Sequence, residues 1–176
     1  MSKKSRHQSI IDSLTQLNYD TYLGHCRWMK YALNLAQTAS NLGEVPVAAV
    51  IVNSEGEIKG EATNRKQREQ DPTAHAEIRA IRTACKTLNS CYLHNCTLYV
   101  TLEPCPMCAG AIIQARLRLL VYGVDDPKTG AIRTVTNLPD SYCSNHRLQV
   151  LAGIQEVSCR HQLQTWFEQQ RKAKKS

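Results

Sequence analysis

Residues 97–122 read TLYVTLEPCPMCAGAIIQARLRLLVY, and this stretch decides the fold class. Its first and last segments, Thr97–Leu102 and Leu119–Tyr122, are short apolar runs that predict buried strands. Between them, Pro106–Arg116 has the length and apolar spacing of a helix, with proline in its first turn. A strand, a helix and a strand in this order form a crossover that places both strands parallel in one sheet. The stretch therefore predicts an α/β domain.

The segments on either side add strands to this sheet and helices around it. Upstream, Val45–Val52 and Ile58–Ala62 predict two antiparallel strands joined by a turn around Gly56. Downstream, Leu148–Leu151 predicts a fifth strand. Apolar spacing predicts three further helices, around residues 29–36, over residues 78–88, and from residue 157 to about residue 172. We therefore expect a mixed five-stranded sheet flanked by helices.

The length of 176 residues fits one compact domain with extensions. We assign residues 1–20 to a polar, flexible N-terminal extension and residues 21–176 to a single domain that ends in a basic helix. No stretch approaches the roughly 18 apolar residues of a membrane span, and the apolar core of a secretory signal is missing. We therefore expect a cytoplasmic protein with no membrane partner. The alternative is an organelle transit peptide, although Arg6 is the only arginine in a segment where several are typical.

The formal net charge of +7 favours a polyanionic partner. Cationic residues gather at both ends of the chain, namely Lys3, Lys4 and Arg6 at the start and Arg171, Lys172, Lys174 and Lys175 at the end. The simpler explanation is that both ends are solvated tails that maintain solubility. Aromatic residues make up only 6% of the chain, which does not indicate a surface that binds RNA mainly by base stacking.

Two short motifs carry the chemistry, His75-Ala76-Glu77 and Pro104-Cys105-Pro106-Met107-Cys108, each at the start of a predicted helix. Cys105 and Cys108 are three residues apart, so they share a face on a first turn, where the helix dipole stabilises thiolates. Crossover topology brings neighbouring helix starts to one end of the sheet, which makes His75 a candidate third ligand. Three ligands with an open fourth position are typical of catalytic zinc, so we predict one Zn²⁺ per chain.

Glu77 is the candidate general acid and base. Zinc with an open position lowers the pKa of a bound water, and a neighbouring carboxylate can take its proton and return it to a leaving amine. Residues two apart on a regular helix point in different directions. His75 must therefore lie at the non-helical start of its helix, and Pro72 just upstream favours such a start.

Eight cysteines are too few for a disulfide scaffold of this length, so metal binding or catalysis is the better interpretation. Cys91, His94 and Cys96 form a rival metal cluster ahead of the third strand, with nothing nearby to orient it. Most of the remaining cysteines are expected to be small buried hydrophobic residues.

Together the two motifs resemble the signature of the zinc-dependent nucleoside and base deaminases, His-x-Glu followed by Pro-Cys-x-x-Cys. Among these the chain looks most like the bacterial tRNA adenosine deaminases, over residues 43–47 (GEVPV), 71–77 (DPTAHAE), 98–111 and 128–131 (KTGA). The resemblance covers about residues 26–171. It implies a three-layer α/β/α sandwich of the cytidine-deaminase type, a homodimer, and zinc-dependent hydrolysis of the wobble adenosine of arginine tRNA to inosine.

The resemblance also implies contacts with the tRNA anticodon stem-loop. By position, Asn64 resembles the asparagine that hydrogen-bonds the flipped nucleotide, and Asp126 resembles an anticodon-loop contact. Glu44 and Arg171 are the other residues expected to bind substrate.

Two other functions stay open at this point. A guanine deaminase of the same fold would also suit residues 71–77 and 103–108, but a free base needs no cationic arms. A non-catalytic zinc-bearing RNA-binding module is the third interpretation, and the presence of Glu77 counts against it.

Overall fold

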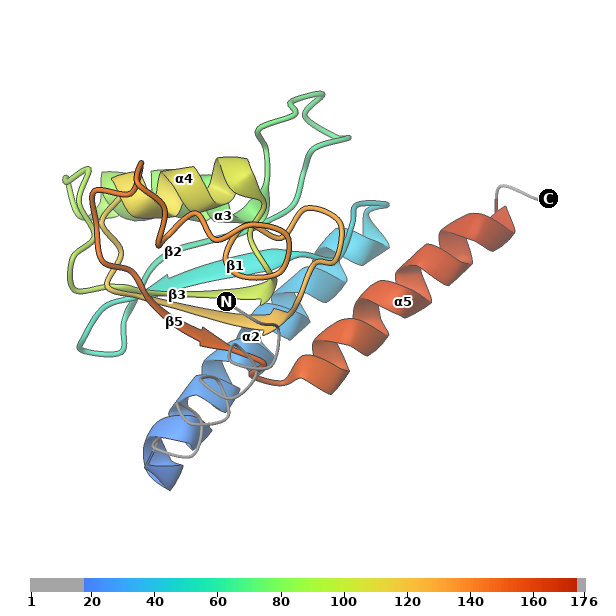
Figure 1. Cartoon of the computed structure of the whole chain (residues 1–176). Helices are drawn as coiled ribbons and strands as arrows, with labels where there is room; N and C mark the ends of the chain where they lie inside the picture. Colours follow the sequence, from blue (N-terminus) through green and yellow to red (C-terminus); the bar gives the residue numbers. More distant parts are fainter. Residues whose placement is uncertain (1–17, 174–176) are drawn as a thin grey trace.

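The computed structural model describes residues 18–173 (Figure 1). The elements in chain order are α2 (Tyr19–Asn41), β1 (Ala48–Val52), β2 (Ile58–Thr63), α3 (Ala76–Thr87), β3 (Thr97–Leu102), α4 (Pro106–Gln114), β4 (Leu119–Val124), β5 (Gln149–Ala152) and α5 (Glu156–Ala173). The expected N-terminal extension lies, up to residue 17, outside the described residues. The same holds for Lys3, Lys4, Arg6, Lys174 and Lys175.

The strands form one sheet in the order β2-β1-β3-β4-β5. β1 runs antiparallel to both β2 and β3, whereas β3, β4 and β5 run parallel to one another. The predicted mixed five-stranded sheet, the β1–β2 hairpin and the β3-α4-β4 crossover are thus confirmed. Three strands, β2, β4 and β5, extend past their predicted ends. Their added residues pair in the sheet: Thr63 with Ala48, Val124 with Leu102, and Ala152 with Tyr122.

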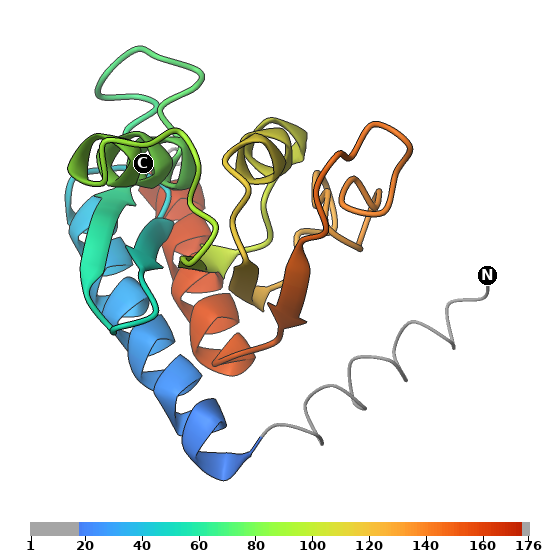
Figure 2. The same ribbon diagram turned by 90° about the vertical axis from the view of Figure 1, so that its left-hand side faces the viewer.

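The helices cover both faces of the sheet. α3 and α4 lie on one face, and α2 and α5 lie on the other (Figures 1 and 2). This arrangement is the expected three-layer sandwich. None of the described helices is both long and apolar enough to span a membrane.

The central strands are apolar on both faces because helices cover them from both sides. All five residues of β1 are buried, as are five of the six residues of β3 and of β4. Strands buried on both faces read as nearly continuous apolar runs, which is the pattern of Thr97–Leu102 in the sequence. The helices contribute small residues to the core, such as Ala32 of α2 and Ala80 of α3.

The starts of α3 and α4 meet at the end of the sheet where β3 ends. α4 begins four residues after Leu102, so its first turn lies just beyond the carboxyl end of β3. α3 packs closely on β2 because Gly60 lacks a side chain: a Cβ there would lie 2.4 Å from Ala80 O and 2.6 Å from Ala84 N. Both helix starts therefore open onto one site.

Candidate active site

His75 and Cys105 occupy equivalent places, each as the N-cap residue of its helix. Both have extended backbones, with φ −71°, ψ 151° at His75 before α3 and φ −71°, ψ 172° at Cys105 before α4. Cys108 is the third residue of α4 and is fully buried. The expectation that His75 lies at a non-helical start is confirmed, which is how His75 and Glu77 can face one site.

These three side chains form a metal-ligating group. His75 Nδ1 lies 3.7 Å from Cys105 Sγ and 3.5 Å from Cys108 Sγ. Tetrahedral zinc with ordinary Zn–S and Zn–N bonds separates such atoms by about 3.6 Å. Among the described residues, His75, Cys105 and Cys108 are the one set of three donors close enough together to hold a metal ion. The donor set and its spacing both fit Zn²⁺.

The electrostatics of the group favour a cation. A hydrogen bond from the Cys108 thiol, with a further contribution from His75, lowers the pKa of Cys105 to about 4. Cys108 shifts the other way, since its contact with Cys105 and its burial raise its pKa. The hydrogen bond with Cys105 raises the pKa of His75. A divalent cation that binds both sulfurs would release the proton of the Cys108 thiol.

Glu77 lies beside this group, on the second residue of α3. Its side chain is 4% exposed, and burial raises the pKa of its carboxyl above the ordinary value. Glu77, His75 and Cys105 line one cavity of about 200 Å³. A buried carboxyl with a raised pKa next to a metal-ligating group is suited to holding and releasing a proton.

Asn64 lines the same cavity, whereas Glu44 lies behind it. Asn64 is 8% exposed and donates a 2.9 Å hydrogen bond from Nδ2 to Glu44 Oε2. Glu44 is 1% exposed, and its Oε1 accepts the backbone N–H of Arg68 at 2.8 Å. Glu44 therefore fixes the amide of Asn64 and the loop that follows it.

Asp126 and Arg171 meet at a second, larger groove. Asp126 lines both the 200 Å³ cavity and a neighbouring groove of about 620 Å³, which Arg171 and Phe167 of α5 also line. The Asp126 carboxylate accepts hydrogen bonds from the Lys128 N–H at 2.9 Å and the Thr129 hydroxyl at 2.6 Å. Asn64, Asp126 and Arg171 thus line two adjoining cavities that share Asp126, whereas Glu44 lines neither.

Glu103 is a residue of the site that sequence analysis treated only as part of a motif. Its side chain is 2% exposed, and its Oε1 accepts the backbone N–H groups of Ile132, Arg133 and Thr134 at 3.1, 2.8 and 3.0 Å. Its Oε2 accepts the Asp126 N–H at 3.0 Å. Glu103 therefore holds the loop after β4 against the cavity. The signal for it was an acid directly after a buried strand.

The alternative prediction of a metal site at Cys91, His94 and Cys96 is wrong. Cys96 is 3% exposed and belongs to the hydrophobic core, whereas Cys91 and His94 are exposed. The three donors do not converge, so among the described residues they form no metal-ligating group.

Comparisons with known proteins agree with this chemistry. The family of MafB19-like deaminases matches residues 23–170. A tRNA-specific adenosine deaminase of Haemophilus influenzae is 48% identical over 149 residues, which are 85% of this chain and 86% of that protein.

Two solved structures differ in how fully they match. One, from biochemical and structural studies of A-to-I editing by tRNA:A34 deaminases at the wobble position, superposes with a TM-score of 0.75 at 41% identity, over 78% of this chain and 99% of that one. A guanine deaminase of Bacillus subtilis gives a TM-score of 0.53 at 42% identity, over 62% of this chain and 66% of that one.

Proposed function

We propose that this chain hydrolyses the wobble adenosine of a tRNA anticodon to inosine, because it belongs to the MafB19-like deaminases and within them to the tRNA-specific adenosine deaminases. The observation that carries this proposal is the grouping of three metal-ligating atoms and the buried Glu77 carboxyl around one cavity. Arginine tRNA is the expected substrate.

His75, Cys105 and Cys108 are the residues that would hold one Zn²⁺ per chain. Bound there, zinc would supply Lewis acidity and would lower the pKa of a water in the cavity. The free N–H groups of the first turn of α4 stabilise the negative charge on the two sulfurs. These three residues leave one side of the site open toward the cavity that Glu77 lines.

Glu77 moves the protons. Its carboxylate accepts a proton from the water that attacks C6 of adenine, and returns a proton to the departing amine, so that adenosine and water become inosine and ammonia. Burial keeps bulk water away from this carboxyl, which stops the proton from being lost to solvent.

Asn64 orients the base. Its Nδ2 donates to a carboxylate oxygen of Glu44, which fixes the direction of the amide. The remaining polar groups of Asn64 are then available to an adenine that has been turned out of its stack. Asp126 and Arg171 border the adjoining 620 Å³ groove, which has room for neighbouring nucleotides of the anticodon loop.

A homodimer is part of the proposal, from membership of the family. Met107 and Ala111 of α4 are only half-buried in the single chain and offer apolar surface near the site. Sedimentation at micromolar concentration tests this, because a species of 19.8 kDa would contradict it.

The decisive experiment compares two substrates. We expect inosine formation on an anticodon stem-loop of arginine tRNA and no ammonia release from free guanine. Salt should weaken the RNA reaction, because phosphate contacts release counterions. Guanine turnover that is insensitive to salt, with an inert stem-loop, would assign the chain to the guanine deaminases instead.

A further inference from the structure

The cavity at the metal-ligating group has room for a base but not for the strand that carries it. Its volume of about 200 Å³ is below the roughly 300 Å³ at which pockets for whole ligands begin. If a nucleobase enters, the sugar and the two flanking phosphates must stay at the rim. Of the residues described as lining the cavity, Lys66 is the one lysine or arginine.

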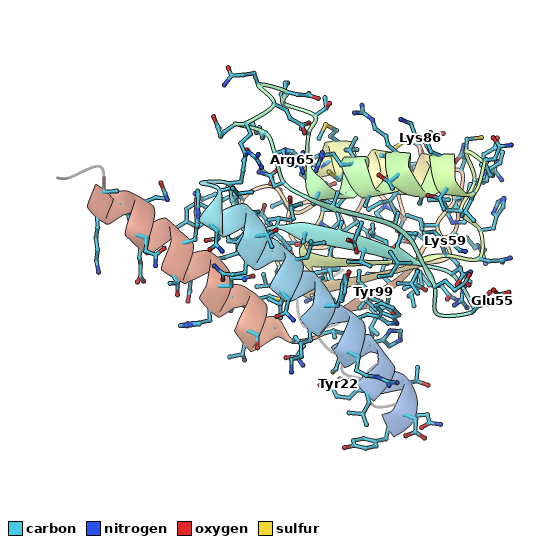
Figure 3. The ribbon with its side chains drawn as sticks, turned by 180° about the vertical axis from the view of Figure 1, so that it is seen from behind. Tyr22, Glu55, Lys59, Arg65, Lys86 and Tyr99 are labelled. Carbon is cyan, nitrogen blue, oxygen red and sulfur yellow. The ribbon has the colours of Figure 1, made fainter. Side chains whose placement is uncertain are left out.

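Lys66 belongs to a loop, residues 64–71, that stands clear of the sheet beside the N-terminal end of α3. Figures 1 and 2 show this loop projecting, and Figure 3 places Arg65 at its base. Despite its projection the loop is held in place. The Arg65 N–H donates to Ala74 O at 3.0 Å, the Asp71 N–H to Lys66 O at 3.3 Å, and the Arg68 N–H to the buried Glu44 carboxylate. The cavity rim is therefore an ordered surface.

The acidic side chains of this loop are engaged within the chain. Glu69 forms ion pairs with Arg65 at 3.4 Å and with Arg79 at 3.3 Å. Asp71 Oδ1 accepts both the N–H and the hydroxyl of Thr73, each at 2.7 Å.

The loop also contains two basic residues outside these ion pairs, Lys66 and Arg68. The side chains of Lys66 and Arg68 are exposed, and neither forms an ion pair with another described residue. Lys66 lines the cavity, and Arg68 lies two residues further along the same loop, where Glu44 holds its N–H. Both are free to bind an external anion without first breaking an internal pair.

We propose that Lys66 and Arg68 form a phosphate-binding rim that contacts the RNA backbone on either side of the nucleotide whose base occupies the cavity. This proposal rests on the proposed function. An RNA strand suits the rim better than an acidic protein segment, because a base in the cavity brings its own phosphates to the two cations. The fixed loop lets these cations select the position of the strand as well as attract it.

The test removes both charges while keeping the backbone N–H that Glu44 accepts. The Lys66→Gln/Arg68→Gln variant is compared with Lys86→Gln/Arg147→Gln, which makes the same change in charge at exposed positions outside the rim; Lys86 lies at the opposite end of α3 (Figure 3). Binding of an anticodon stem-loop is measured from low to high salt, together with inosine formation.

We expect the rim variant to lower the salt slope of binding by roughly 1.4, at about 0.7 for each single-strand phosphate contact. KM for the stem-loop should rise several-fold, and kcat should stay within about threefold of the parent value. The control variant should keep the parent slope. The proposal would be wrong if the rim variant kept the parent salt slope, or if the control variant lost as much of the slope as the rim variant does. If the parent chain itself made no inosine on the stem-loop, the proposed function would fail, and the rim with it.

Discussion

Gly130 lies so close to Glu103 that a Cβ on residue 130 would come within 2.2 Å of Glu103 Oε2. This contact belongs to the network in which one buried carboxylate holds the loop after β4 against the active-site cavity. Asp126 lies in that loop and lines the cavity. Because Gly130 has no side chain, the loop can lie close to Glu103, and this sets the position of the cavity wall that contains Asp126.

Replacing Gly130 by alanine should displace this wall. The added methyl must push Glu103 or the loop aside, which we expect to lower the free energy of unfolding by about 1–3 kcal/mol and to raise KM for the stem-loop. Gly24→Ala is the matched control, because nothing lies within 4 Å of a Cβ there. Because Gly24 lies inside α2, past its first turn, that change should stabilise the fold by up to about 1 kcal/mol. Urea unfolding of both variants decides the matter, and equal stability would contradict the prediction.

Glu77→Gln should abolish turnover without harming the fold. The amide has nearly the same shape but cannot accept and return a proton, so we expect kcat to fall at least ~100-fold. The free energy of unfolding should not decrease, because an amide avoids the cost of burying a charge at this 4% exposed position. Single-turnover inosine formation and metal content are measured together. If the variant kept more than a tenth of the parent rate, Glu77 would not be the general acid and base.

Much of the fold and the metal-ligating group was predictable because both depend on local patterns. Thr97–Leu102 is a continuous apolar run, and Pro106 marks the start of a helix, so β3 and α4 follow from neighbouring residues. The two motifs contain all three expected metal ligands, His75, Cys105 and Cys108. His75 needed two geometric arguments: crossover topology brought it to the cysteines, and its spacing from Glu77 required it to precede its helix. The extended backbone at His75 agrees with the second.

The supporting network was not predictable, because its partners are backbone groups far away in the sequence. Glu103 accepts N–H groups from residues 29, 30 and 31 positions further along the chain. Every residue except proline offers such a donor, so no residue type marks the partner. Glu44 illustrates the same limit. It was expected to bind substrate, and the structure shows it buried against Asn64 and the backbone of Arg68.

Metal content should depend on the two sulfurs. We expect the purified chain to carry about one Zn²⁺, and the Cys105→Ala/Cys108→Ala variant to carry almost none, because a lone histidine cannot retain the ion. Cys143→Ala is the control, since this cysteine is exposed and lies outside the metal-ligating group. Elemental analysis of all three proteins gives the answer. Zinc that stays bound to the double variant would exclude this assignment.

His25 should make the fold sensitive to acid. Its Nδ1 lies 3.0 Å from the hydroxyl of Tyr99, and burial, with the nearby Arg118, lowers its pKa below the ordinary 6.5. As pH falls through that ordinary value, the unfolded chain takes up a proton that the folded chain resists, so the free energy of unfolding decreases. His25→Gln removes this contribution. Urea unfolding from pH 7.5 to 5 should therefore give a shallower loss for the variant, and parallel curves would count against the prediction.

Glu44 should act on the reaction through Asn64. A glutamine at position 44 has one acceptor oxygen, and if this oxygen keeps the Arg68 N–H, its NH2 group faces the Asn64 Nδ2 donor. The Asn64 amide must then turn over to accept from this NH2 group, or lose its partner. We expect Glu44→Gln to lower the free energy of unfolding by at most about 1–3 kcal/mol, which is the cost when a buried donor stays unpaired. It should also lower kcat/KM, because the Asn64 amide is no longer held in one orientation.

A double-mutant cycle separates this positioning role from a loss of stability alone. Asn64→Ala should lower kcat/KM by removing the group that orients the base, and adding Glu44→Gln to it should cost little more, since Glu44 then has no amide to hold. The kcat/KM values of the parent, the two single variants and the double variant are compared at a temperature where all four are folded. Losses that multiply would mean that Glu44 and Asn64 act independently, and the 2.9 Å hydrogen bond between them would then carry no part of the substrate orientation.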